Sequence, residues 1–199
     1  MFKEAVFTGD SGLYTLQMTQ DTPPSAVVLA GASAMRVAII GDDSLPAWDF
    51  TGAGSAFTVA QYGHLSLGYL TLSTTSTHDG GGASTIAAAL GGEVSIDQSM
   101  LMDVSFAVHG TLALSTTQAT DIQLWTDPGS AVTMTAVALI GLTAPLTLAF
   151  ACPTTIMNSQ VNNIQLRSCG DAPPWRVRPG RRAVGRNSRS PQVGPGTPC

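Results

Sequence analysis

Short runs in which apolar and hydroxyl side chains alternate recur along most of the chain, and they constrain the fold more than any other feature. In one of them, Val104, Phe106 and Val108 alternate with small residues, so one face of an extended segment is apolar. Comparable runs predict strands at 13–18, 26–30, 35–40, 56–62, 65–73, 102–115, 121–125 and 131–142. The sequence therefore predicts an all-β fold.

Clusters of Asp, Gly, Pro and Ser separate these runs and favour chain reversal. They lie at 21–24, 41–44, 79–82 and 127–130. Pro presets φ, Gly permits a positive φ, and Asp can hydrogen-bond to the backbone that follows it. Many short strands with such turns predict an antiparallel β-sandwich or jelly roll, and we find no convincing internal repeat. At most one short helix is expected, over 84–91, with Ser84 as its N-cap.

The charges divide the chain into an acidic body and a basic C-terminal segment. Residues 1–165 contain 2 basic and 12 acidic residues, whereas residues 166–199 contain 7 basic residues and 1 acidic residue. The net charges are therefore −10 and +6. From 167 onward the chain is too poor in apolar side chains to offset its entropy, which predicts a disordered tail. We expect an N-terminal segment with the first strand (1–20), a sandwich body (21–166) and the tail (167–199).

The tail contains the residues that we expect to contact a partner, which are Arg176, Arg178, Arg181 and Arg182. Guanidinium groups bind phosphate and carboxylate through paired hydrogen bonds. Nucleic acid and the acidic face of a neighbouring subunit are therefore both candidate partners. A solvated extension without a function and an unintended reading frame are the alternatives.

The uncharged segment 131–152 is long enough in principle to cross a bilayer as a helix. Its threonines, Gly141, Pro145 and the alternation of its first half favour two core strands instead. We therefore expect no membrane span. The N-terminus lacks the basic start and apolar run of a secretory signal, which predicts that the protein matures inside the cell that makes it.

No motif predicts a catalytic residue, a metal site or a cofactor. The segment Gly9–Gly12 matches the nucleophile motif of chymotrypsin-like proteases, but it lies before every histidine, so a turn is the preferred interpretation. The common nucleotide-binding and hydrolase motifs are absent. The three cysteines match no metal-ligand spacing, and the acidic turns at Asp42–Asp43 and Asp79 lack the full ligand loop of an EF-hand.

Two alternatives to a purely structural role depend on residues scattered along the chain. A carbohydrate-binding or adhesive β module would use exposed aromatic side chains, for which the candidates are Trp48, Tyr62, Tyr69 and Trp125. A hydrolase with a dispersed site would need histidines beside acids, for which the candidates are His64, His78 and His109 with Asp79, Asp103 or Asp121. Their spacing matches no local motif, so separate surface positions are favoured.

The hydroxyl-rich strands from 65 to 142, the run 130–142 and the short polar start resemble, in general character, capsid decoration or cement proteins of tailed bacteriophages and related jelly-roll virion proteins. The resemblance implies a homo-oligomer, with a trimer favoured, that contacts other virion proteins and is located in the virion after assembly in the host cytoplasm. It transfers no catalytic residue. Independently, an apolar strand face too extensive for one sheet must be covered by a second sheet or by copies of the chain. We therefore expect a non-enzymatic structural or assembly protein that acts through subunit contacts.

Overall fold

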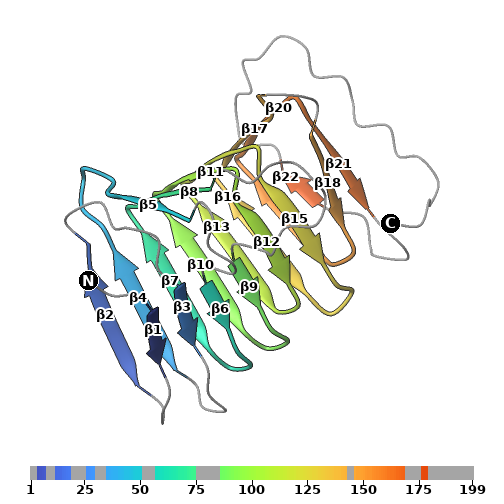
Figure 1. Cartoon of the computed structure of the whole chain (residues 1–199). Coiled ribbons are helices and arrows are strands. Elements are labelled where there is room, and N and C mark those ends of the chain that lie inside the picture. The colour runs from blue at the N-terminus through green and yellow to red at the C-terminus, as the bar shows by residue number, and fades with distance from the viewer. Residues whose placement is uncertain are drawn as a thin grey trace.

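The computed structural model of the protein describes residues 4–7, 12–18, 26–29, 35–50, 57–74, 86–142, 146–168 and 176–178. In these residues the chain winds through about five turns of a parallel β-solenoid (Figure 1). A typical turn adds one strand to each of three sheets, which we call sheets A, B and C. Because consecutive strands lie in different sheets, the solenoid is built without antiparallel hairpins.

Sheet A contains, in order, β1 (Glu4–Phe7), β3 (Ala26–Leu29), β6 (Phe57–Val59), β9 (Ile86–Ala88), β12 (Ser105–Val108) and β15 (Gln123–Thr126). Sheet B contains β2 (Leu13–Gln17), β4 (Arg36–Ile40), β7 (His64–Gly68), β10 (Glu93–Asp97), β13 (Thr111–Ser115), β16 (Ala131–Thr135), β19 (Thr154–Met157) and β22 (Arg176–Arg178). Sheet C contains β5 (Ala47–Asp49), β8 (Thr71–Ser73), β11 (Met100–Met102), β14 (Gln118–Thr120), β17 (Ala138–Ile140) and β20 (Gln160–Asn162). Next to β15, the strands β18 (Leu146–Phe150) and β21 (Ile164–Ser168) pair with each other.

Each strand pairs with the equivalent strand one turn further along the chain. In sheet B, Arg36 pairs with His64, His64 with Glu93, Glu93 with Thr111, and Thr111 with Ala131. These steps are 28, 29, 18 and 20 residues long. The turns are therefore structural repeats of unequal length, which explains why no fixed period is found in the sequence.

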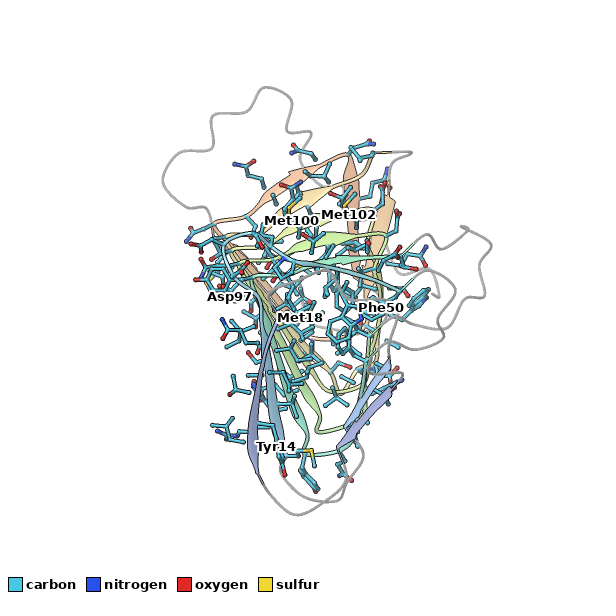
Figure 2. The ribbon with its side chains drawn as sticks, turned by 60° about the vertical axis from the view of Figure 1, so that its left-hand side comes forward. Tyr14, Met18, Phe50, Asp97, Met100 and Met102 are labelled. Carbon is cyan, nitrogen blue, oxygen red and sulfur yellow. The ribbon has the colours of Figure 1, made fainter. Side chains whose placement is uncertain are left out.

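The core runs along the middle of the solenoid and is filled by every second residue of the strands (Figure 2). Sheet B supplies two fully buried apolar columns, Val37, Leu65, Val94, Leu112 and Val132 beside Ile39, Leu67, Ile96, Leu114 and Met134. Toward the N-terminal end, the Trp48 ring lies 5.4 Å from Phe50 and 5.1 Å from Phe57, measured between centroids. The alternation in the sequence thus separates a continuous core from an outer face.

The corners between sheets B and C each bend the chain at one residue in the left-handed conformation. These residues are Leu45, Tyr69, Gln98, Thr116, Ala136 and Asn158, with φ between 47° and 55°. The residue after the bend faces inward, and in three turns it is a hydroxyl residue that closes the corner: Ser99, Thr117 and Ser159 each donate to the carbonyl two residues earlier. Ser99 and Ser159 also accept the N–H of the equivalent residue one turn earlier, Leu70 and Val137. The hydroxyl groups of Ser99 and Ser159 thus join adjacent turns where the chain leaves sheet B.

The expectation of an antiparallel β-sandwich or jelly roll is wrong, because every strand pairing in the described residues is parallel. Alternation of side chains is the same in both architectures, and only the corners distinguish them. The segments 65–73 and 131–142, each expected to be one strand, are two strands joined by the corners at Tyr69 and Ala136. Segment 102–115 likewise contains β12 and β13. At Tyr69 and Ala136 the residue in the left-handed conformation is neither Gly nor Pro, so these two bends could not be recognised from residue type.

Three further expectations concern the predicted helix, the C-terminal arginines and the membrane span. The helix over 84–91 is wrong where residues are described, since 86–88 form β9 and the N–H of Gly92 closes a turn onto Ala89. Residues 176–178 form β22, which pairs with β19 and places Arg176 and Arg178 on the last strand of sheet B, whereas Arg181 and Arg182 lie outside the described residues. Among the described residues, no helix is long and apolar enough to cross a membrane.

Candidate functional site

Two neighbouring turns place an exposed aromatic side chain beside a histidine–aspartate pair where sheet A ends. Ala107 in β12 pairs with Trp125 in β15, and His109 and Asp127 directly follow the ends of these two strands and are exposed. Trp125 is 50% exposed, and the side chains of His109 and Asp127 are 54% and 56% exposed. We call these four residues the corner patch. Its members come from two turns and are adjacent only because of the parallel register.

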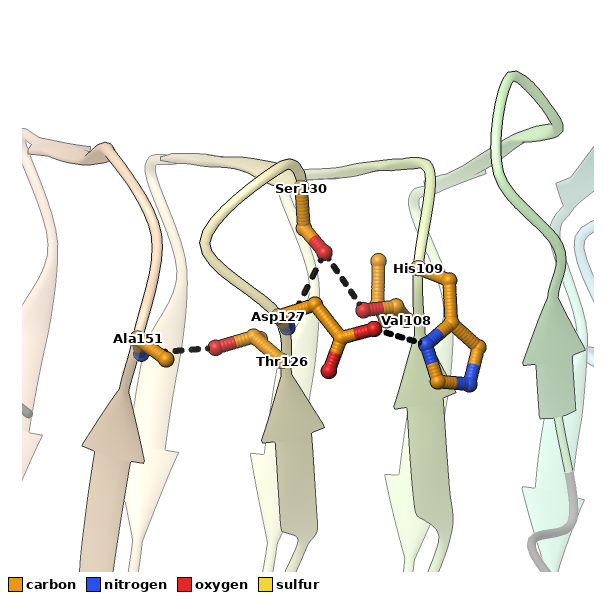
Figure 3. Close-up of polar contacts among 6 residues, drawn as sticks. All are labelled: Val108, His109, Thr126, Asp127, Ser130 and Ala151. Atoms are coloured by element: carbon orange, nitrogen blue, oxygen red, sulfur yellow. Dashed lines mark hydrogen bonds and ion pairs between the residues drawn. The ribbon is translucent and has the colours of Figure 1, made fainter. Parts of the chain in front are cut away.

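Hydrogen bonds between successive turns hold the backbone of this corner in place (Figure 3). The buried hydroxyl of Ser130 donates to the carbonyl of Val108 at 2.6 Å and accepts the N–H of Asp127 at 3.1 Å. One turn further on, the N–H of Ala151 donates to the hydroxyl of Thr126 at 2.9 Å. Residues 127–130 also form a tight turn, in which the N–H of Ser130 donates to the carbonyl of Asp127. Asp127 is therefore fixed beside the preceding turn.

The carboxylate of Asp127 contacts Nδ1 of His109, so this ring nitrogen is occupied within the patch. The carboxylate offers further acceptor sites, and Nε2 of His109 is the ring nitrogen that points away from Asp127 (Figure 3). When His109 is protonated the pair is a salt bridge, and when it is neutral the pair is a hydrogen bond. The corner patch therefore presents hydrogen-bonding groups in a defined orientation next to the indole of Trp125.

A second histidine–acid pair lies on the outer face of sheet B, where Nδ1 of His64 is 3.0 Å from the carboxylate of Glu93. Arg36 occupies the register position next to His64. The two described histidines thus have different acidic partners, neither of which is Asp103 or Asp121. His78 and Asp79, which were also candidates for the dispersed hydrolase site, lie outside the described residues.

Asp103 and Asp121 occupy corners at the end of sheet C strands, with φ of 56° and 50°. The carboxylate of Asp121 is mostly buried and accepts the N–H of Leu142 at 2.8 Å. That bond spans one turn of the solenoid, as the bonds of Ser130 do. The role of Asp121 is therefore to hold a corner rather than to activate a histidine.

The four aromatic candidates for sugar binding have different surroundings. Trp48 is buried in the core, and the hydroxyl of Tyr69 accepts a hydrogen bond from the amide of Gln98 at 2.6 Å. Tyr62 is 57% exposed and lies at the corner before β7, against Gly91 of the next turn. Of the four, Trp125 is the exposed residue that lies on a strand and precedes the acid of a histidine–acid pair, whereas Tyr62 precedes His64 from a corner.

The other motifs that the sequence singled out are parts of turns or of the core. Ser44 donates both its N–H and its hydroxyl to the carboxylate of Asp42, and the hydroxyl bond is the main reason why the pKa of Asp42 lies below its ordinary value. Cys152 is buried beside Thr154. The described parts of the chain contain no group of three His, Cys, Asp or Glu side chains that could hold a metal ion. Residues 9–11 of the protease-like motif are not described.

Sequence reasoning singled out His109 and Trp125 but treated Asp127 only as a turn residue. Asp127 follows His109 by 18 residues, which is one turn of the solenoid, so their contact becomes visible only when the register is known. No model of a protein family, no curated protein and no solved structure matches the chain.

Proposed function

We propose that the protein is a non-enzymatic structural or assembly protein that acts through contacts between copies of its own chain. The observation that supports this most is the N-terminal end of the solenoid, which the described residues leave open. The resemblance to capsid decoration proteins was based on the hydroxyl-rich strands, and the jelly roll that it implied is not the fold of this chain. A role in a virion, with contacts to other virion proteins, stays a prediction, and the proposal rests on the solenoid end alone.

At this end, β2 is the outermost strand of sheet B and, within the described residues, has a hydrogen-bonded strand on one side only. Leu16 occupies the register position of the buried Ile39, yet it is 40% exposed. Leu13 on the same strand is 74% exposed. Figure 2 places Tyr14 at one end of this strand and Met18 toward the other, facing the space between the sheets. An edge strand with apolar residues invites pairing with another chain.

A second copy is the partner that fits this edge. The two edges of sheet B are β2 and β22, and all eight strands run in one direction, so β22 of one copy can extend the parallel ladder of β2 in the next. The acidic body, with a net charge of −10, and the basic segment, with +6, favour the same head-to-tail arrangement. Such a contact is heterologous, so it does not fix the number of subunits, and a trimer stays a prediction.

The test compares two leucine variants of the full chain by sedimentation velocity and native mass spectrometry at micromolar concentration. Leu16→Lys puts a charge on the open end, whereas Leu142→Lys changes a leucine that is 69% exposed just after β17 of sheet C. We expect the wild type and Leu142→Lys to form oligomers and Leu16→Lys to be monomeric. Circular dichroism spectra of all three proteins are the control that each one is folded.

A wild-type chain that is monomeric at tens of micromolar would overturn the proposal, as would equal effects of the two leucine variants. Nucleic acid is the competing partner for the basic segment. A mobility shift with random-sequence DNA that disappears when Arg176, Arg178, Arg181 and Arg182 are changed to Glu, together with a monomeric protein, would favour nucleic acid binding instead.

A further inference from the structure

We propose that the corner patch binds a neutral carbohydrate, with one sugar ring packed beside Trp125 and its hydroxyl groups bonded to Asp127 and His109. This inference is independent of the contact between copies, because the patch lies on the outer face of sheet A, many strands away from β2.

The first support is the surroundings of the indole. Trp125 belongs to an outward column of sheet A in which Thr58, Ala87 and Ala107 precede it in register. Each of these side chains is small, so the indole stands at the end of a low surface about 14 Å wide, at about 4.8 Å per strand. Leu124 fills the core from the same strand and is 6% exposed. The exposed ring therefore contributes little to the packing of the interior, and its face is available to an apolar sugar face.

The second support is the position of the polar groups relative to the ring. Trp125 lies on β15 and Asp127 directly follows the end of this strand, so the two are two residues apart, about 6.6 Å at the rise of a strand and comparable to the width of one pyranose ring. Asp127 and His109 offer acceptors and a ring nitrogen that can donate or accept, which suits the paired hydroxyl groups of a sugar. The bonds of Ser130 to Val108 and Asp127 hold these groups before a ligand arrives, so little ordering is needed on binding.

The third support is charge, which selects the class of carbohydrate. The body of the protein is strongly acidic, with 2 basic residues and 12 acidic residues in 1–165. A glycan with uronic acid or sulfate groups would be repelled by this surface and by Asp127, whereas a neutral glycan would not. The second pair, His64 with Glu93, has no aromatic residue at the following register positions Ser66 and Ser95. Tyr62 precedes His64 by two residues but lies at a corner outside the strands, with a φ of 64°, so this pair serves as a comparison site whose aromatic residue is placed differently.

The test measures the binding of cellohexaose, maltohexaose and N-acetylchitohexaose by calorimetry and by ligand-observed NMR, with polygalacturonate oligomers as the acidic comparison. We expect Trp125→Ala and Asp127→Asn to weaken binding of the preferred neutral oligosaccharide by at least about tenfold, the size of effect expected for a central contact. Trp125→Phe keeps an aromatic ring and should retain part of the affinity. Tyr62→Ala and Glu93→Gln, which change an exposed aromatic residue and the acid of the other pair, should bind as the wild type does.

Failure of all three neutral oligosaccharides to bind at millimolar concentration would overturn the proposal. So would binding that Trp125→Ala leaves unchanged, or equal losses in Tyr62→Ala and Trp125→Ala. Stronger binding of the acidic oligomers than of the neutral ones would also contradict it. Repeating the titration with Leu16→Lys separates this proposal from the one on assembly, since the monomeric variant should bind the oligosaccharide with unchanged affinity.

Discussion

Ser130 provides a direct test of the idea that single hydroxyl groups hold successive turns together. Its side chain is 3% exposed and bonds to two backbone groups, the carbonyl of Val108 on the preceding turn and the N–H of Asp127 on its own turn. In Ser130→Ala both bonds are lost without a large change in volume. The contact of the Asp127 N–H with the Val108 carbonyl at 3.4 Å remains, so neither group loses every partner.

The expected cost follows from the two lost bonds. A hydrogen bond within a protein contributes about 1 kcal/mol net, and leaving a buried partner incompletely paired adds to the loss. Ser130→Ala should therefore lower the free energy of unfolding by about 2 kcal/mol. For a chain of this length, 1 kcal/mol corresponds to roughly 2–4 °C in the melting temperature, so we expect a decrease of about 4–8 °C.

The measurement is thermal unfolding of both Ser130→Ala and Ser115→Ala, followed by circular dichroism. Ser115 lies on the outer face of β13, where its hydroxyl contacts only the exposed Thr116 hydroxyl at 3.4 Å, so its removal should change stability by less than about 0.5 kcal/mol. Hydrogen exchange should speed up locally at Asp127 in Ser130→Ala. Equal melting temperatures for the two variants would refute the reasoning.

Three further perturbations have defined outcomes. In Gly110→Ala the new Cβ would lie 2.1 Å from the carbonyl oxygen of Gly92, whereas at Gly68 the nearest atom to a new Cβ is 3.8 Å away. Gly110→Ala should therefore prevent folding or lower the melting temperature by more than 10 °C, which is about 3 kcal/mol or more of stability. Gly68→Ala should have little effect. Thr116 is β-branched at a φ of 48°, so Thr116→Asn should raise stability by about 1 kcal/mol in chemical denaturation, and a loss would argue against the left-handed corner. Ser44 lowers the pKa of Asp42, so this contact stabilises the fold at pH values above 3.8, the ordinary pKa, and the stabilisation is lost as the pH falls through the lowered pKa. Ser44→Ala should raise the pKa of Asp42 toward 3.8 in an NMR titration. An unchanged pKa would contradict the bond.

The strands could be predicted from the sequence, but the way they pair could not. Leu65 and Leu67 face the core as their alternation predicts, and so do Phe106 and Val108. The residue that bends the chain at the corner after β7 is Tyr69, not the Gly68 before it, and a non-glycine residue with a positive φ leaves no reliable trace in a single sequence. The turn clusters suggested reversals, and antiparallel pairing followed from that assumption.

A recognisable pattern does accompany the solenoid once its register is known. Apolar residues or hydroxyl residues occupy the first, third, sixth and eighth positions of the blocks 65–72, 94–101, 112–119 and 132–139. The sixth position follows the left-handed residue and faces inward. Because the blocks begin 29, 18 and 20 residues apart, a search for one period misses them, whereas an alignment of blocks with free spacing would find them.

The candidate site could be predicted only in part for the same reason. His109 and Trp125 were singled out because of their residue types, yet His64 was grouped with His109 when the structure gives each its own acid. The acids are Glu93 and Asp127, and each follows its histidine by one turn of the solenoid. Such contacts depend on the pairing of strands, so they could not be deduced before the topology.

The parallel register of sheet B is the central claim, and distances between spin labels on its outer face test it most directly. Ser66, Ser95, Ala113, Thr133 and Thr155 occupy one column on successive strands. With labels at Ser66 and Thr133, and then at Ser66 and Thr155, electron paramagnetic resonance should give backbone separations of about 14 Å and about 19 Å, increasing by one strand spacing. Separations that do not increase from Thr133 to Thr155, or that exceed these values by more than the length of the labels, would contradict the solenoid.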